Sequence, residues 1–223
     1  MIGFYNYTMV LTYMSLLSAS LGIITALSGD GHPYLGIFFL LFCGLCDAFD
    51  GKVARTKKDR TERENKFGIQ VDSLSDLVAF GVLPCAIGVA KFNTSEFFGS
   101  LNQRKLAYGI TIAILLLYVL AAMIRLAYFN VTEEERQRTE DGSRKYYIGL
   151  PVTSAAIIFP AMALIQCLLP TIDLSLAYFV VMGLTAIAFI SNIKVKKPGL
   201  CAILGMVGIG IVEFIIMLVI KGR

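Results

Sequence analysis

The sequence has no tryptophan, a single histidine and few charged residues, which make up only 16% of its 223 positions. Soluble globular domains carry about 25% charged residues, so this scarcity argues against a soluble protein. The chain is 57% hydrophobic and has a mean hydropathy of +0.72, which is typical of a protein that lies in a lipid bilayer. This composition excludes disordered, collagen-like and disulfide-rich chains. A net charge of +4 is too small to indicate a nucleic-acid partner.

The five cysteines all lie inside apolar stretches, which predicts small core residues rather than disulfide bridges. The pair Cys43-x-x-Cys46 lacks the second pair that a structural zinc site needs. The only histidine, His32, falls in a short connection on the opposite side of the membrane from the aspartates at positions 47–76, and is interpreted as a loop residue.

Seven stretches of roughly 20 mostly apolar residues predict transmembrane helices. They run from Met9 to Leu27, Pro33 to Ala54, Ile69 to Ala90, Leu106 to Phe129, Leu150 to Leu169, Leu174 to Ile193 and Leu200 to Ile220. The sequence therefore predicts an all-α integral membrane protein, a polytopic bundle of six to eight helices in one domain over residues 1–223. The first stretch has no basic flank or cleavage site, which favours a retained helix over a signal peptide.

Most of the 20 basic residues lie in the second, fourth and sixth connections, around residues 52–66, 125–145 and 194–197. Short cytoplasmic loops are rich in Lys and Arg, so these connections and the N-terminus are predicted to be cytoplasmic. With seven spans the C-terminus is expected outside.

Four aspartates lie where the second span ends and the third begins: Asp47, Asp50, Asp72 and Asp76. Each costs about 2.5 to 3.5 kcal/mol at the centre of a membrane helix, so the group needs compensation. Their i,i+3 and i,i+4 spacings place each pair on one face of its helix. In adjacent antiparallel helices the four carboxylates face one another at one depth, and divalent cations are the natural way to neutralise them. The alternative is that they are solvated interfacial residues.

Oxygen ligands without nearby His or Cys favour Mg²⁺ or Mn²⁺. On the same face as the first two carboxylates, Gly51 and Ala54 leave room for a ligand, and Arg55 supplies a planar group suited to phosphate. Together these features predict a pocket for a diphosphate. For the two small residues alone, tight helix packing is the alternative.

Read in order, Asp47-x-x-Asp50-Gly51-x-x-Ala54-Arg55 and Gly68-x-x-x-Asp72-x-x-x-Asp76 resemble the signature of the CDP-alcohol phosphatidyltransferase family. Further segments resemble the phosphatidylserine synthase branch of that family: Asp72–Asp76, Phe80–Pro84, Arg125–Asn130 and Gly149–Pro151. The chain also departs from the family pattern. Twelve residues separate Arg55 from Gly68, more than is usual, and no Pro-Asn precedes Thr12.

The resemblance implies transfer of a phosphatidyl group from CDP-diacylglycerol to the hydroxyl of serine, with release of CMP. It implies that Asp47, Asp50 and Asp72 bind one metal ion, that Asp47, Asp72 and Asp76 bind a second, and that Asp76 is the general base. The residues that it places at the CDP-lipid are Gly51, Ala54, Arg55, Thr12, Asn65 and Gly68. It also implies a homodimer in the cell membrane with its active site on the cytoplasmic side; Gly205 and Gly208 would suit helix packing.

A serine acceptor needs a cation for its carboxylate, and Arg125 is the best candidate, with Asn130 a turn later. The alternatives are a snorkelling helix-end anchor for Arg125 and a helix cap or loop position for Asn130. The charged stretch from Glu133 to Lys145 is predicted to be a solvated loop. Glu213, within the last span, has no evident partner.

Two other functions remain open. A transferase of the same family that uses glycerol 3-phosphate or an inositol phosphate would need further basic residues near the pocket, such as Arg144 or Lys145. An ion transporter would also carry carboxylates within membrane helices, but near the midplane and in inverted repeats.

Overall fold

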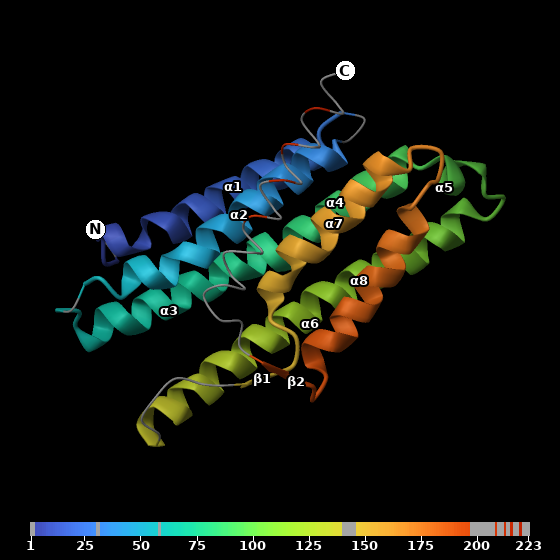
Figure 1. Cartoon of the computed structure of the whole chain (residues 1–223). Coiled ribbons are helices and arrows are strands. Elements are labelled where there is room, and N and C mark those ends of the chain that lie inside the picture. The colour runs from blue at the N-terminus through green and yellow to red at the C-terminus, as the bar shows by residue number, and fades with distance from the viewer. Residues whose placement is uncertain are drawn as a thin grey trace.

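The computed structural model describes residues 3–29, 32–57, 59–139 and 146–196, and the single positions 208, 212, 215 and 219. Its elongated helices run side by side (Figure 1). They are α1 (Val10–Leu27), α2 (Pro33–Ala54), α3 (Glu62–Asp76), α4 (Leu83–Thr94), α5 (Glu96–Ser100), α6 (Arg104–Thr139), α7 (Ala155–Leu168) and α8 (Ser175–Ile190). Short turns of 3-10 helix, η1 (Tyr7–Met9) and η3 (Val152–Ser154), precede α1 and α7.

Four helical stretches are long and apolar enough to cross a membrane: Tyr7–Leu27, Pro33–Ala54, Glu62–Thr94 and Arg104–Arg136. The helices α7 and α8 are apolar but shorter. The protein is therefore an all-α integral membrane protein, as its composition predicts. The second span has the predicted bounds, and the α-helix of the first span, α1, begins one residue later than predicted. The seventh predicted span, with Gly205 and Glu213, lies outside the described residues, apart from four single helical positions that include Gly208.

The connection between α2 and α3 is shorter than the sequence suggests, because α3 begins at Glu62 and not near Ile69. A capping box starts the helix: the Thr61 hydroxyl accepts from the Glu64 backbone N–H, and the Glu64 carboxylate accepts from the Thr61 N–H. The predicted spans leave residues 55–68 as a connection, and this prediction is wrong for the second half of that segment. We call the end of the bundle at residues 55–61 the basic end.

A π-helical turn, η2 (Leu77–Val82), joins α3 to α4 without a break in the helix. The Leu83 N–H donates to the carbonyl of Val78, five residues earlier, as in a π-helix. Pro84 explains the wider turn, since a proline inside a helix has no N–H to donate and its ring clashes with the carbonyl four residues earlier.

The helix α6 is longer than predicted and ends at Thr139. Asn130 therefore lies inside a helix, and its interpretation as a cap or loop residue is wrong. The predicted solvated loop from Glu133 begins as helix as well, where Arg136 forms an i,i+3 ion pair with Glu133 at 2.6 Å. Arg144 and Lys145 lie outside the described residues.

The core lies where α2, α4, α6, α7 and α8 meet, and glycines allow the closest approaches. A Cβ on Gly36 would lie 2.6 Å from Ile87 Cγ1, and a Cβ on Gly44 would lie 2.5 Å from the Cβ of Ala156. Of the cysteines, Cys43, Cys46 and Cys85 are buried free thiols and Cys167 is half-buried, which confirms their predicted role in packing. Cys201 lies outside the described residues.

A two-stranded antiparallel sheet, which the sequence does not predict, lies where α7 begins and α8 ends (Figure 1). The strands are β1 (Tyr146–Ile148) and β2 (Lys194–Lys196), with Tyr147 opposite Val195. The basic residues Lys194 and Lys196 of the sixth connection thus lie on a strand.

Candidate active site

The four aspartates come from two consecutive helices that meet at the basic end. Asp47 and Asp50 lie on the last turns of α2, and Asp72 and Asp76 on the last turns of α3. Asp50 and Asp72 lie close enough for their carboxyl groups to interact, and Asp47 and Asp76 interact electrostatically with this pair. Asp76 is the most enclosed, with 8% of its surface exposed. The structure thus brings together the residues that the spacing pattern pairs.

The donor chemistry of this group fits a divalent cation. All of its side-chain donors are carboxylate oxygens, and their mutual repulsion is relieved by a hard cation such as Mg²⁺ or Mn²⁺. In the part of the chain that the structure describes, no three Asp, Glu, His or Cys side chains are gathered closely enough to hold an ion.

Arg55 and Gly51 share one surface at the end of α2. Arg55 is the exposed C-cap residue of the helix, and its guanidinium folds back so that a Cβ on Gly51 would lie 3.8 Å from Nη1. Ala54, the last residue of α2, is half-buried. Small side chains next to an exposed guanidinium leave room for an anionic ligand on the carboxylate side of the bundle.

Two of the three remaining residues predicted to contact the lipid substrate lie between α1 and α3. A Cβ on Gly68 would lie 3.4 Å from Met9 Cε and 3.6 Å from Arg60 Nη2. Thr12 is buried, and its carbonyl accepts a hydrogen bond of 3.1 Å from the Ser75 hydroxyl. Asn65 is exposed on the first turn of α3. The structure therefore places Gly68 and Thr12 at one helix interface and Asn65 on the surface.

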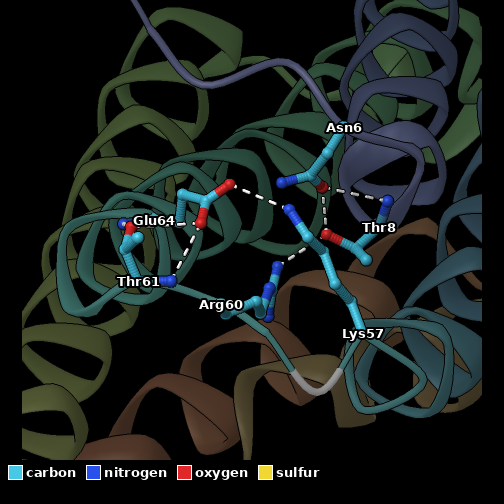
Figure 2. Close-up of polar contacts among 6 residues, drawn as sticks. All are labelled: Asn6, Thr8, Lys57, Arg60, Thr61 and Glu64. Atoms are coloured by element: carbon cyan, nitrogen blue, oxygen red, sulfur yellow. Dashed lines mark hydrogen bonds and ion pairs between the residues drawn. The ribbon is translucent and has the colours of Figure 1, made fainter.

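A polar network that the sequence does not reveal joins the N-terminal segment to the connection after α2 (Figure 2). Arg60 Nη2 donates to the Thr8 hydroxyl at 2.6 Å, and Asn6 Oδ1 accepts from the Thr8 backbone N–H at 3.1 Å. On the other side, Lys57 Nζ lies 2.9 Å from Glu64 Oε1. Only the Thr61-x-x-Glu64 capping box within this network has a local sequence signal.

Arg125 and Asn130, the predicted acceptor residues, both lie on α6 but make different contacts. Arg125 is buried, and its Nε donates to the Leu150 carbonyl at 3.1 Å. Asn130 Nδ2 donates to the Ser73 hydroxyl at 2.7 Å, so it touches the residue next to Asp72. Of the two, Asn130 is therefore the one in contact with the helix that carries the carboxylates.

The chain is similar in sequence to several proteins of known function. The CDP-diacylglycerol--serine O-phosphatidyltransferase of Saccharomyces cerevisiae is 34% identical over 139 residues, which cover 61% of this chain and 44% of that protein. The Helicobacter pylori protein of the same name is 29% identical over 183 residues, which cover 79% of this chain and 67% of that protein. The archaetidylserine synthase of Methanothermobacter thermautotrophicus is 33% identical over 145 residues, 65% of this chain and 53% of that protein.

The chain thus spans between about two fifths and two thirds of the length of these relatives. No solved structure matches it. Residues 5–194 match the CDP-alcohol phosphatidyltransferase family, and this range contains the four aspartates, Arg55 and Gly68. The protein belongs to the CDP-alcohol phosphatidyltransferase family.

Proposed function

We propose that this protein transfers the phosphatidyl group of CDP-diacylglycerol to the hydroxyl of L-serine and releases CMP. The observation that carries the proposal is the meeting of Asp50 on α2 with Asp72 on α3, beside Arg55 and Gly51. The names of the relatives, which act on serine or make archaetidylserine, support the choice of acceptor. The excess of basic residues at this end supports a multi-pass protein of the cell membrane with its site on the cytoplasmic side.

Enzymes of this family generally use divalent metal ions. We propose two ions, Mg²⁺ or Mn²⁺, held by Asp47, Asp50, Asp72 and Asp76. When bound, they would neutralise the diphosphate and the departing CMP.

The protein's own residues would bind and orient the two substrates and deprotonate the serine hydroxyl. Arg55 would pair with diphosphate oxygens, and Gly51, Ala54 and Gly68 would let the substrate approach the helices. Asp76 would accept the hydroxyl proton of serine as the serine oxygen bonds to the phosphatidyl phosphorus. The bond from that phosphorus to the CMP oxygen breaks in the same displacement. Because a carboxylate is a weak base, Asp76 would act through its position beside the hydroxyl.

We place the acceptor between α3 and α6. Asn130 already contacts the helix of Asp72 through Ser73, and the Arg125 guanidinium, oriented by the Leu150 carbonyl, is the cation we assign to the serine carboxylate. We also propose that the protein is a homodimer, which the mass of the detergent-solubilised protein would test.

The direct test is CMP release by the purified protein in detergent, with CDP-diacylglycerol and Mn²⁺ or Mg²⁺. Serine, glycerol 3-phosphate and inositol phosphate are offered separately, and chelator removes the metal in a parallel reaction. We expect release only with serine and metal. Release with another alcohol would keep the transfer chemistry and overturn the serine assignment. No release with any acceptor, by a folded protein that binds Mn²⁺, would overturn the enzyme and leave ion transport as the next function to test.

A further inference from the structure

The helix that carries Asp72 and Asp76 is irregular directly after Asp76. The turn η2 begins at Leu77, and Pro84 near the start of α4 cannot donate to the carbonyl of Phe80, four residues earlier. That carbonyl is buried in the bundle, where an unpaired backbone group is costly.

The missing donor is supplied by another helix. The hydroxyl of Tyr118 on α6 donates to the Phe80 carbonyl at 2.8 Å, and the Tyr118 side chain is fully buried. Its ring is fixed by neighbours on both sides, with centroids 5.8 Å from Phe159 and 5.4 Å from Phe189. Tyr118 therefore replaces the hydrogen bond that Pro84 removes and supports the wide turn.

The π-helical turn sets the angle about the helix axis between the packed face of α4 and the face of α3 that carries Asp72 and Asp76. Beyond it, α4 is locked against its neighbours, because Leu83 packs on Gly22 of α1 and Ile87 packs on Gly36 of α2. Before it, Asp72 and Asp76 interact electrostatically with the carboxylates of α2. One extra residue in a turn rotates the two ends of a helix by about 100° relative to each other, compared with a regular α-helix. With α4 fixed, a return to regular helix would rotate Asp76 away from α2.

We infer that Tyr118 is a positioning residue for the acidic site: by donating to the Phe80 carbonyl, it stabilises the π-helical turn that aims Asp76 at the carboxylates of α2. The inference rests on the proposed function for its kinetic readout and on the proposed metal site for its Mn²⁺ readout. Neither Tyr118 nor Pro84 belongs to the eight signature residues, and Tyr118 lies on a different helix.

The chain offers a matched control. Tyr178 on α8 is also fully buried, and its hydroxyl also donates to a backbone carbonyl of this helix at 2.8 Å. Its acceptor is Pro84, beyond the π-helical turn. Tyr178→Phe removes the same hydroxyl group from an equally buried side chain and leaves the hydrogen bond to the Phe80 carbonyl intact.

The test compares four variants for thermal stability in detergent, for the half-saturating Mn²⁺ concentration in direct binding, and for kcat and KM of CMP release. We expect Tyr118→Phe to lower the melting temperature, to lower kcat about tenfold and to weaken Mn²⁺ binding, with little change in KM for CDP-diacylglycerol. Tyr178→Phe should lower the melting temperature while kcat and Mn²⁺ binding stay near wild type.

The other two variants separate positioning from simple stability. Pro84→Ala supplies an N–H for the Phe80 carbonyl, so the protein should be as stable as wild type but slow, because the helix becomes regular. In the double variant Tyr118→Phe/Pro84→Ala the melting temperature should recover and kcat should stay low. Pro84→Ala also keeps the test decisive if Tyr118→Phe does not fold.

Recovery of kcat together with stability in the double variant would overturn the inference, as would wild-type kcat and Mn²⁺ affinity in Pro84→Ala. If the wild-type protein releases no CMP with any acceptor, the proposed function fails. The Mn²⁺ affinities then still decide whether Tyr118 orients the carboxylates.

Discussion

Arg60 and Thr8 lie 52 positions apart in the chain, and a hydrogen bond of 2.6 Å joins the Arg60 guanidinium to the Thr8 hydroxyl. This contact joins the connection after α2 to the segment before α1 (Figure 2). Arg60 belongs to the twelve residues between Arg55 and Gly68, a separation that is longer than the family pattern.

We expect Arg60→Ala to lower the stability of the protein by about 1 to 2 kcal/mol, because it removes a charged donor from a partly buried hydroxyl. Melting temperature in detergent and the rate of proteolysis at residues 55–61 measure the effect. Arg63→Ala is the control, since Arg63 is exposed on the first turn of α3. Equal effects of the two substitutions would show that the contact with Thr8 contributes nothing.

Asp76→Asn should abolish CMP release while metal-dependent binding of the CDP-lipid partly survives. The substitution removes the proposed base and one carboxylate ligand, but Asp47, Asp50 and Asp72 remain. Turnover and calorimetric binding of the lipid in Mn²⁺ measure the two effects separately. Asp59→Asn, on the exposed connection, should behave as wild type. Near-normal turnover of Asp76→Asn would remove Asp76 from the base role.

Gly149→Ala should destabilise the protein by about 2 kcal/mol or more. Gly149 has φ +78°, and a Cβ there would lie 2.6 Å from the carbonyl oxygen of Phe189 and 3.3 Å from Arg125 Nε. The melting temperature should fall clearly. On α8, Gly183→Ala adds a methyl group where no atom of the described residues lies within 4 Å, and it should leave the melting temperature unchanged or slightly higher. A neutral Gly149→Ala would contradict this account of the turn.

Stability should fall at acidic pH through Asp173, which lies between α7 and α8. Burial acts to raise the pKa of this carboxyl, but hydrogen bonds from Ser95, Ser175 and the Phe97 N–H outweigh it and lower the pKa to about 2. A group whose pKa is lower in the folded state stabilises the protein above its unfolded pKa, here 3.8, and this contribution disappears as pH falls toward 2.

Melting temperatures between pH 5 and pH 2 test this expectation, with Asp173→Asn beside the wild type. The difference between the two proteins should be largest at pH 5 and shrink toward pH 2. A difference that stays constant over this range would mean that the ionisation of Asp173 does not stabilise the fold.

Local signals in the sequence predict the helices well and the contacts between distant segments poorly. The bounds of α2 are predictable because Pro33 suits the first turn of a helix and polar residues follow Ala54. The start of α3 also has a local signal in Thr61 and Glu64, although hydropathy alone places the helix too late. The β1 and β2 pairing has no such signal, since two strands of three residues come from segments almost 50 positions apart.

In the candidate site too, local spacing is predictable from the sequence and contacts between distant segments are not. The i,i+3 and i,i+4 spacings of the aspartates predict which carboxylates share a face, because helix geometry is regular over one turn. The donation from Tyr118 to Phe80 and that from Arg60 to Thr8 depend on how helices dock, which spacing does not encode. Pro84 marks an irregular helix in the sequence, but only the packed structure identifies the side chain that compensates for it.

The small sheet at the base of α7 and α8 has a consequence for biogenesis. With 14 and 16 residues, these helices are about 21 and 24 Å long, less than the roughly 30 Å of a bilayer's hydrocarbon core. Pairing of residues 146–148 with 194–196 joins the start of α7 to the end of α8. We therefore expect the two helices to enter the membrane together as one hairpin, after residue 196 has been synthesised.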